Sequence, residues 1–178
     1  MSQLPCPQNN PTEGSPTTID DICEDPSLLD AGGPGGAAGG VYQNIPDGEV
    51  IQDVQDTYVG GKRSGTISEF VVFNGKIVPK EIAVYLRPMF QAAAAEGVTL
   101  QVTSGFRTYA EQERLKAEDP YNAARAGRSP HQRGFAVDMN TRGPGQYEWL
   151  VKNAYRYGFV RTVTRERWHW EYRGNWPG

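Results

Sequence analysis

The sequence predicts an α+β domain preceded by an irregular, acidic N-terminal arm. Helix-like and strand-like apolar patterns alternate after residue 62 without the regular spacing of βαβ units, which favours α+β over a doubly wound sheet. The strand candidates are short, and two of them flank a hairpin turn signal, so we expect a small antiparallel sheet flanked by helices. Residues 1–61 differ from this pattern, because they hold ten acidic residues and no Lys or Arg.

We expect residues 1–61 to form an arm outside the folded domain, which would span residues 62–178. The first 40 residues are rich in Pro, Gly, Ser, Thr and acidic residues, and bury too little apolar surface to offset the entropy cost of ordering. Residues 41–59 are more apolar and could form short extended pieces. The domain carries 18 basic against 11 acidic residues, so an acidic docking segment on a basic domain is expected.

The two cysteines and the N-terminus bear on the cellular setting. Cys6 and Cys23 both lie in the arm and could close a disulfide, but their spacing fits neither a redox motif nor a zinc site. The opening residues Met1–Pro5 lack the basic and apolar regions of a secretory signal, which favours two free thiols. The chain is 38% hydrophobic, and its longest apolar run is far short of the ~20 residues of a membrane span.

The domain is expected to begin with a hairpin and a long helix. Ile67–Phe73 is an apolar strand, and Asn74-Gly75 is a turn signal before a short return strand at residues 76–78. A helix should follow over Lys80–Glu96, in which Pro88 predicts a kink or a weakened turn. Apolar residues at three- and four-residue spacing form its expected buried face: Ile82, Tyr85, Leu86, Met89, Phe90 and Ala93.

The remaining elements alternate between strand and helix. Thr108 and Glu111 form a capping signal for the second helix. The third helix should bury Tyr147, Leu150 and Val151 together with Ala154. In chain order we expect a strand at 98–103, a helix at 109–118, a loop at 119–130, a strand at 134–139, a helix at 146–157, and strands at 159–160 and 168–172.

The chain has two histidines, and each lies close in sequence to carboxylates. A two-residue strand period would place His131 and Asp138 on opposite faces, but a turn ending at Gly134 would bring them to the same side. In the last strand, His169 and Glu171 share one face, and Trp168, Trp170 and Tyr172 share the other as a packing surface.

His131, Asp138 and His169 could therefore form a metal site of two nitrogens and one carboxylate oxygen. Catalytic zinc sites have three protein ligands and keep a fourth position for water. Glu166, three residues before His169, could serve as a general base, and Arg107 could bind a carboxylate or an oxyanion.

Each of these residues taken alone is more often structural or a surface residue. Glu171 could orient His169 or be an ordinary strand carboxylate. The interpretation as a metal site therefore depends on the combination of residues.

Three sequence blocks carry a family resemblance. They are Ser104-Gly105-Phe106-Arg107 with Gln112, then Ser129-x-His131-x-x-Gly134-x-Ala136-x-Asp138, then Glu166-x-x-His169-x-Glu171-Tyr172. In this order the blocks resemble the VanY-type D-alanyl-D-alanine carboxypeptidases and the related L-alanyl-D-glutamate endopeptidases of phage lysins, which share the hedgehog/D,D-peptidase fold. The resemblance covers roughly residues 76–172. It implies zinc ligands at His131, Asp138 and His169, a catalytic base at Glu166 and a substrate- or transition-state-binding arginine at Arg107.

The resemblance also implies a function and a setting. We expect zinc-dependent hydrolysis of peptidoglycan stem peptides, with the D-Ala-D-Ala and L-Ala-D-Glu bonds both open. Because no export signal is visible, a phage product is expected: a lysin made in the cytoplasm and released to the wall, or a virion enzyme docked to tail or baseplate proteins by its arm. The alternative is a tail or baseplate component whose peptidase fold only binds the wall. An arm that covers and inhibits the domain is a third option. No nucleic-acid partner is expected.

Overall fold

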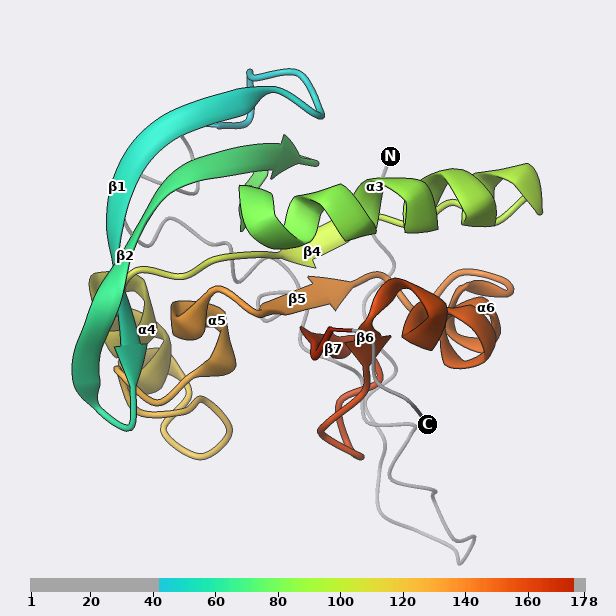
Figure 1. The fold of residues 1–178 in the computed structure, drawn as a ribbon. Coiled ribbons are helices and arrows are strands. Elements are labelled where there is room, and N and C mark those ends of the chain that lie inside the picture. The colour runs from blue at the N-terminus through green and yellow to red at the C-terminus, as the bar shows by residue number, and fades with distance from the viewer. Residues whose placement is uncertain (1–41, 175–178) are drawn as a thin grey trace, which may run out of the picture.

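The computed structural model describes residues 42–174, which form two antiparallel sheets and the helices packed on them (Figure 1). Residues 1–41 and 175–178 are outside this description, and with them Cys6 and Cys23. Their free or paired state stays a prediction. Among the described helices, none is long and apolar enough to cross a membrane.

The first sheet contains three strands in the order β1-β2-β3: β1 (Val50–Val59), β2 (Lys62–Phe73) and β3 (Lys76–Pro79). The predicted hairpin joins β2 to β3, with Phe73 opposite Lys76. Its two turn residues have positive φ angles, 50° at Asn74 and 72° at Gly75, as the mirror-image hairpin turns require. Figure 1 shows β1 and β2 as a long curved hairpin whose far end reaches α4 and α5.

Residues 42–61 are part of this fold, which corrects the expectation that the folded domain starts at Lys62. Strand β1 pairs with β2 along its length, from Val50 opposite Val71 to Val59 opposite Lys62. Tyr42 is buried in a small apolar cluster at the base of the hairpin, and its hydroxyl donates a hydrogen bond to Asp53 at 2.8 Å. Both acidic residues of β1 have partners in the fold: Asp53 also accepts from the Gln55 amide at 2.8 Å, and the exposed Asp56 pairs with Arg63 at 2.8 Å. The docking role of residues 1–41 stays a prediction.

Helix α3 (Lys80–Ala95) lies across the second sheet and covers it (Figure 1). It is continuous through Pro88 and buries Ile82, Ala83, Leu86, Met89 and Ala93, close to the predicted face. Tyr85 was predicted on this face but is 42% exposed, and its ring stacks on that of Tyr172 at a centroid distance of 4.7 Å.

The second sheet has the order β4-β5-β7-β6 and lies beneath α3. Its strands are β4 (Val102–Ser104), β5 (Ala136–Met139), β6 (Phe159–Val160) and β7 (His169–Tyr172). Strand β4 is shorter than the predicted strand at 98–103. The main core lies between this sheet, α3 and α6, and includes Leu86, Val137, Met139, Leu150, Phe159 and Trp170.

Three further helices complete the fold: α4 (Tyr109–Glu118), α5 (Pro130–Arg133) and α6 (Gln146–Asn153), the last continued by the 3-10 turn η2 (Ala154–Tyr157). Helix α4 has the predicted bounds and the complete capping box of Thr108 and Glu111. The predicted buried face of α6 is wrong in part: Trp149 is buried and Val151 is 54% exposed, because the large indole ring takes the core position.

Candidate metal centre

The ring of His131 is held by the loop that follows β4. Helix α5 carries His131 and ends at Gly134, whose φ of 84° turns the chain into β5, where the sequence predicted a turn. The His131 Nδ1–H donates to the Gly105 carbonyl oxygen at 2.7 Å, because a carbonyl can only accept. A Cβ at position 105 would overlap the Ile77 carbonyl oxygen, so only glycine fits there. The His131 Nε2 is left facing Asp138 Oδ1 at 3.1 Å.

Asp138 and His169 meet because they are cross-strand partners on β5 and β7. Directly opposed residues of neighbouring strands point to the same face. His169 Nδ1 lies 3.0 Å from Asp138 Oδ1, the same oxygen that faces His131. The ligand atoms of His131, Asp138 and His169 all lie within 4.8 Å of one another, and all three side chains are buried.

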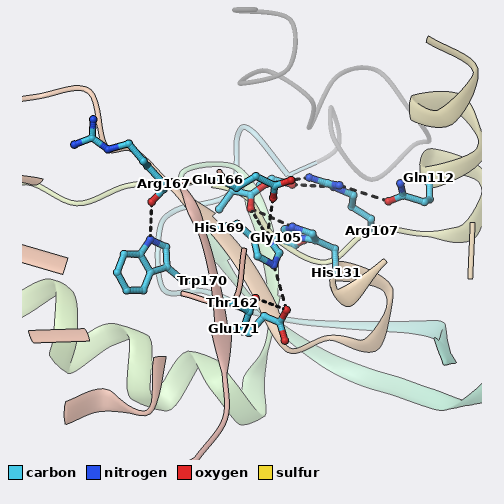
Figure 2. A network of polar contacts seen from close by, with 12 residues as sticks. Gly105, Arg107, Gln112, His131, Thr162, Glu166, Arg167, His169, Trp170 and Glu171 are labelled. Atoms are coloured by element: carbon cyan, nitrogen blue, oxygen red, sulfur yellow. Dashed lines mark hydrogen bonds and ion pairs between the residues drawn. The ribbon is translucent and has the colours of Figure 1, made fainter. Parts of the chain in front are cut away.

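Arg107 binds the second oxygen of the same carboxylate. Its Nη2 donates to Asp138 Oδ2 at 3.0 Å, and its Nε donates to Ser104 Oγ at 3.1 Å. Gln112 accepts from Arg107 Nη1 at 3.5 Å and donates to the Ala124 carbonyl at 2.9 Å. Figure 2 shows Arg107 between Gln112 and the centre, where His131 and His169 lie.

These contacts determine the charges at the centre. Burial by itself raises the pKa of Asp138, but its contacts with His131, His169 and Arg107 outweigh burial and hold that pKa well below the usual range. Burial has the largest effect on the pKa of His131 and lowers it, and the Arg107 charge lowers it further. Together they outweigh Asp138, which raises that pKa. The neutral imidazole, which is the form that ligates metals, is therefore favoured at His131.

The outer nitrogen of His169 contacts Glu171. The distance from His169 Nε2 to Glu171 Oε1 is 3.4 Å, and Thr162 donates to the same oxygen at 2.7 Å. Arg173 donates to the other oxygen at 2.6 Å. The hydrogen bond from His169 has the largest effect on the pKa of Glu171 and lowers it. Burial opposes this effect, but the Thr162 bond adds to the lowering, and the pKa falls to about 2. Burial lowers the pKa of His169, but bonds to Asp138 and Glu171 outweigh it and raise that pKa to about 9.

Glu166 lies at the edge of the centre, in the segment between β6 and β7. Its Oε2 is 3.9 Å from His169 Nδ1, and its side chain is 37% exposed. Burial raises the pKa of Glu166 above its ordinary value, which brings this carboxylate closer to the range of a general base. A cleft of about 270 Å³ opens beside it, with a lining that includes Arg107, Gln112, Leu115, Ala123, Ala124, Ser129, His131, Val163, Trp168 and His169.

The structure brings all five predicted site residues to this cleft. It differs from the sequence prediction at two neighbouring aromatic residues. Trp168 lines the cleft instead of packing beneath β7, because the strand begins one residue later, at His169. Phe135, which falls within the strand predicted at 134–139, is 45% exposed, and β5 begins after it, at Ala136. Sequence reasoning missed Thr162 and Arg173, since neither has a motif that signals its contact with Glu171.

The donor set suits a divalent metal such as zinc. Two imidazole nitrogens and one carboxylate oxygen are zinc ligand types, and a set of three leaves a position open, as in catalytic sites. Each histidine is also held at its other nitrogen, His131 by the Gly105 carbonyl and His169 by Glu171, as is usual for metal ligands.

Comparison with known proteins identifies the family. Residues 75–175, more than half of the chain, match the family model of VanY, D-alanyl-D-alanine carboxypeptidase. The chain belongs to the VanY family. It is 34% identical over 134 residues to a D-alanyl-D-alanine carboxypeptidase of Enterococcus faecalis, covering 57% of this chain and 50% of that protein. It is 33% identical over 129 residues to the putative carboxypeptidase YodJ of Bacillus subtilis, covering 56% and 47%. The chain thus spans about half the length of these curated relatives.

Solved VanY structures share the fold. One is a vancomycin-resistance D,D-pentapeptidase VanY variant in complex with Zn(II), with 30% identity, a TM-score of 0.51, and coverage of 70% of this chain and 81% of that one. Another is VanYB in complex with D-Alanine-D-Alanine, with 29% identity, a TM-score of 0.52, and coverage of 74% and 82%. The predicted α+β, D,D-peptidase-like fold is confirmed.

Proposed function

We propose that this VanY family chain is a zinc-dependent peptidase that hydrolyses stem-peptide bonds of peptidoglycan. The observation that carries the proposal is the convergence of His131, Asp138 and His169 beside Glu166 in one cleft. The Zn(II) and D-Alanine-D-Alanine complexes of VanY structures support both the metal and the substrate class. Of the two bonds left open by the sequence, the family favours D-Ala-D-Ala.

His131 Nε2, His169 Nδ1 and an Asp138 oxygen would hold the metal. When bound, zinc supplies a Lewis acid and a water of lowered pKa. The protein prepares this set by fixing each histidine ring at its outer nitrogen. Arg107 compensates the buried charge of Asp138, which would otherwise be costly to hold in the interior.

Glu166 is the proposed general base. It borders the cleft 3.9 Å from a ligand nitrogen, so it is close to a water at the centre without occupying a ligand position. It would take the proton of the attacking water and deliver it to the leaving amine. Its burial-raised pKa makes it a stronger proton acceptor than an ordinary glutamate.

Arg107 is the residue that we propose to stabilise the negative charge that develops on the substrate in the cleft. One of its nitrogens is engaged by Asp138 and another by Ser104, so the guanidinium is fixed in orientation at the cleft wall. A fixed guanidinium stabilises an oxyanion as it develops, without reorganising at the moment of reaction.

The test is digestion of purified peptidoglycan by the full chain loaded with zinc, followed by mass spectrometry of the released fragments. His131→Ala and His169→Ala should lose metal binding, because two ligands hold a metal much less firmly than three. Glu166→Gln should keep bound zinc and lose at least about 100-fold in rate, the usual contribution of a general base. Full activity of Glu166→Gln would contradict the assignment of Glu166 as the general base. Intact binding of peptidoglycan without any release by the zinc-loaded protein would favour the wall-binding alternative.

The termini of the released fragments also identify which peptide bond is hydrolysed. Loss of one terminal D-Ala identifies the carboxypeptidase, and a new D-Glu amino terminus identifies the endopeptidase. A role as phage lysin or virion-associated enzyme, with tail or baseplate partners, stays a prediction from the sequence.

A further inference from the structure

The proposed base, Glu166, is held by its backbone and not by its own side chain. Among the described residues, its carboxylate has one close polar contact, the 3.9 Å approach to His169. A general base must be kept within hydrogen-bond reach of the proton it takes. The backbone of the segment 161–168, between β6 and β7, must therefore supply the precision that the side chain lacks.

The backbone around Glu166 is tied by three hydrogen bonds. The Glu166 amide donates to the Val163 carbonyl at 3.2 Å, and the His169 amide donates to the Glu166 carbonyl at 3.3 Å. The indole Nε1–H of Trp170 donates to the Arg167 carbonyl at 3.1 Å. These bonds shape the turn, and each lies within a few residues of Glu166. The segment is joined to the second sheet near its two ends, where the Met139 amide donates to the Trp168 carbonyl at 2.9 Å and Thr162 donates to Glu171 at 2.7 Å.

Arg167, the residue directly after Glu166, adds a contact with α6. Its guanidinium carbon lies 3.9 Å from the ring centroid of Tyr147, on α6. Its Nε is buried and has no hydrogen-bond partner among residues 42–174, so the ring face is the contact that compensates its loss of water. Arg161, at the other end of the segment, lies 5.5 Å from the same centroid. Figure 2 shows Arg167 directed away from the metal centre.

The environment of Arg167 differs from that of an arginine on a solvated surface. A surface arginine keeps its donors in water, whereas Arg167 has a buried Nε over an aromatic face. The two arginines that contact Tyr147 bracket Glu166 in sequence. One ring on α6 thus contacts arginines on both sides of the base.

We propose that Tyr147 is a positioning residue for Glu166: it clamps the segment 161–168 to α6 through Arg167 and Arg161. The inference rests on the proposed role of Glu166 as base. Tyr147 touches neither the metal ligands nor the cleft, so it acts only through the position of the segment.

The test compares Tyr147→Leu, which removes the aromatic face, with Tyr147→Phe, which keeps it. Tyr147→Leu should lower kcat by about 10- to 100-fold, because a misplacement on the order of 1 Å costs about that much. KM and zinc affinity should stay at the wild-type values, and Tyr147→Phe should retain wild-type kcat. The matched control is Tyr155→Leu, which removes the exposed Arg156–Tyr155 contact at 5.8 Å and should change none of these quantities.

A double variant separates positioning from general damage. If Tyr147 acts through Glu166, Tyr147→Leu should cause no further loss in a Glu166→Gln protein. Multiplied losses, or a lowered zinc affinity in Tyr147→Leu, would overturn the inference, and so would wild-type kcat in that variant.

Amide hydrogen exchange gives a readout that does not depend on activity. The Glu166 and His169 amides, which are hydrogen-bonded within the segment, should exchange at least about 10-fold faster in Tyr147→Leu than in Tyr155→Leu. Unchanged exchange would also overturn the inference. If the zinc-loaded wild-type protein releases no fragments, the proposed function fails, while the exchange result still decides whether Tyr147 clamps the segment.

Discussion

At the scale of single residues, the metal centre depends on which nitrogen each histidine turns inward. A neutral imidazole has one N–H and one lone pair, so a partner at one nitrogen decides the role of the other. At His131 the partner is a backbone carbonyl, which can only accept. At His169 it is the carboxylate of Glu171, which Thr162 and Arg173 hold in place. The sequence left the role of Glu171 open, and its contacts favour an orienting role.

Replacing Glu171 should therefore weaken metal binding without removing a ligand. We expect Glu171→Ala to lower zinc affinity about 10- to 100-fold, the usual effect of losing an outer partner of a ligand histidine. Competition with a chromogenic chelator measures it. Glu69→Ala is the control, because Glu69 lies on the hairpin and pairs with Lys80 at 3.0 Å, so its zinc affinity should match the wild type. Equal affinities in the two variants would show that Glu171 is an ordinary strand carboxylate.

At the scale of elements, the centre is assembled where the two sheets meet. The Phe106 amide donates to the Ile77 carbonyl at 2.8 Å, which ties the loop after β4 to β3. That contact brings the Gly105 carbonyl to His131. The close approach works because Gly105 has no Cβ to meet the Ile77 oxygen. The glycine thus links the packing of the hairpin sheet to the orientation of a metal ligand.

Gly105→Ala should separate the two sheets at this point. Because the obstacle is a backbone carbonyl, which cannot rotate away, we expect a loss of about 2 kcal/mol or more in the free energy of unfolding. Zinc affinity should fall as well, since His131 loses its partner. Gly65→Ala is the control: a Cβ there meets Thr57 Oγ1 at an ordinary 3.5 Å. Denaturant unfolding and zinc titration of both variants test this, and equal stabilities would contradict it.

At the scale of the whole molecule, the fold starts earlier than composition suggested. Tyr42 packs in the cluster of Phe70, Val72 and Phe106, and β1 covers the edge of β2. Removal of residues 1–41 leaves these contacts in place, whereas removal of residues 1–61 takes away Tyr42 and the whole of β1.

The two truncations should therefore behave differently. Without residues 1–41, the unfolding free energy and zinc affinity should match those of the full chain. Without residues 1–61, we expect a loss of at least about 3 kcal/mol, the cost of deleting one buried aromatic side chain, and aggregation through the bare edge of β2. Thermal unfolding and size-exclusion chromatography distinguish them. A well-folded, monomeric chain starting at Lys62 would restore the domain boundary expected from composition.

Features that are encoded by contiguous residues could be predicted before the structure was known. The hairpin at Asn74-Gly75, the bounds of α4 with its capping box, and the motif blocks around His131 and His169 were all predictable, because turn and cap chemistry acts over a few positions. The α+β fold and the approach of the predicted ligands followed from strand parity and from the family resemblance.

Contacts between distant segments, by contrast, could be seen only in the folded chain. Residues 42–61 join the fold because Tyr42 and β1 find partners on β2, which composition cannot show. The buried face of α6 and the place of Trp168 depend on which large ring fills the core and where a strand begins. The contact of Arg167 with Tyr147 joins two elements with no shared motif. Such pairings arise from packing of the whole chain, so no local pattern records them.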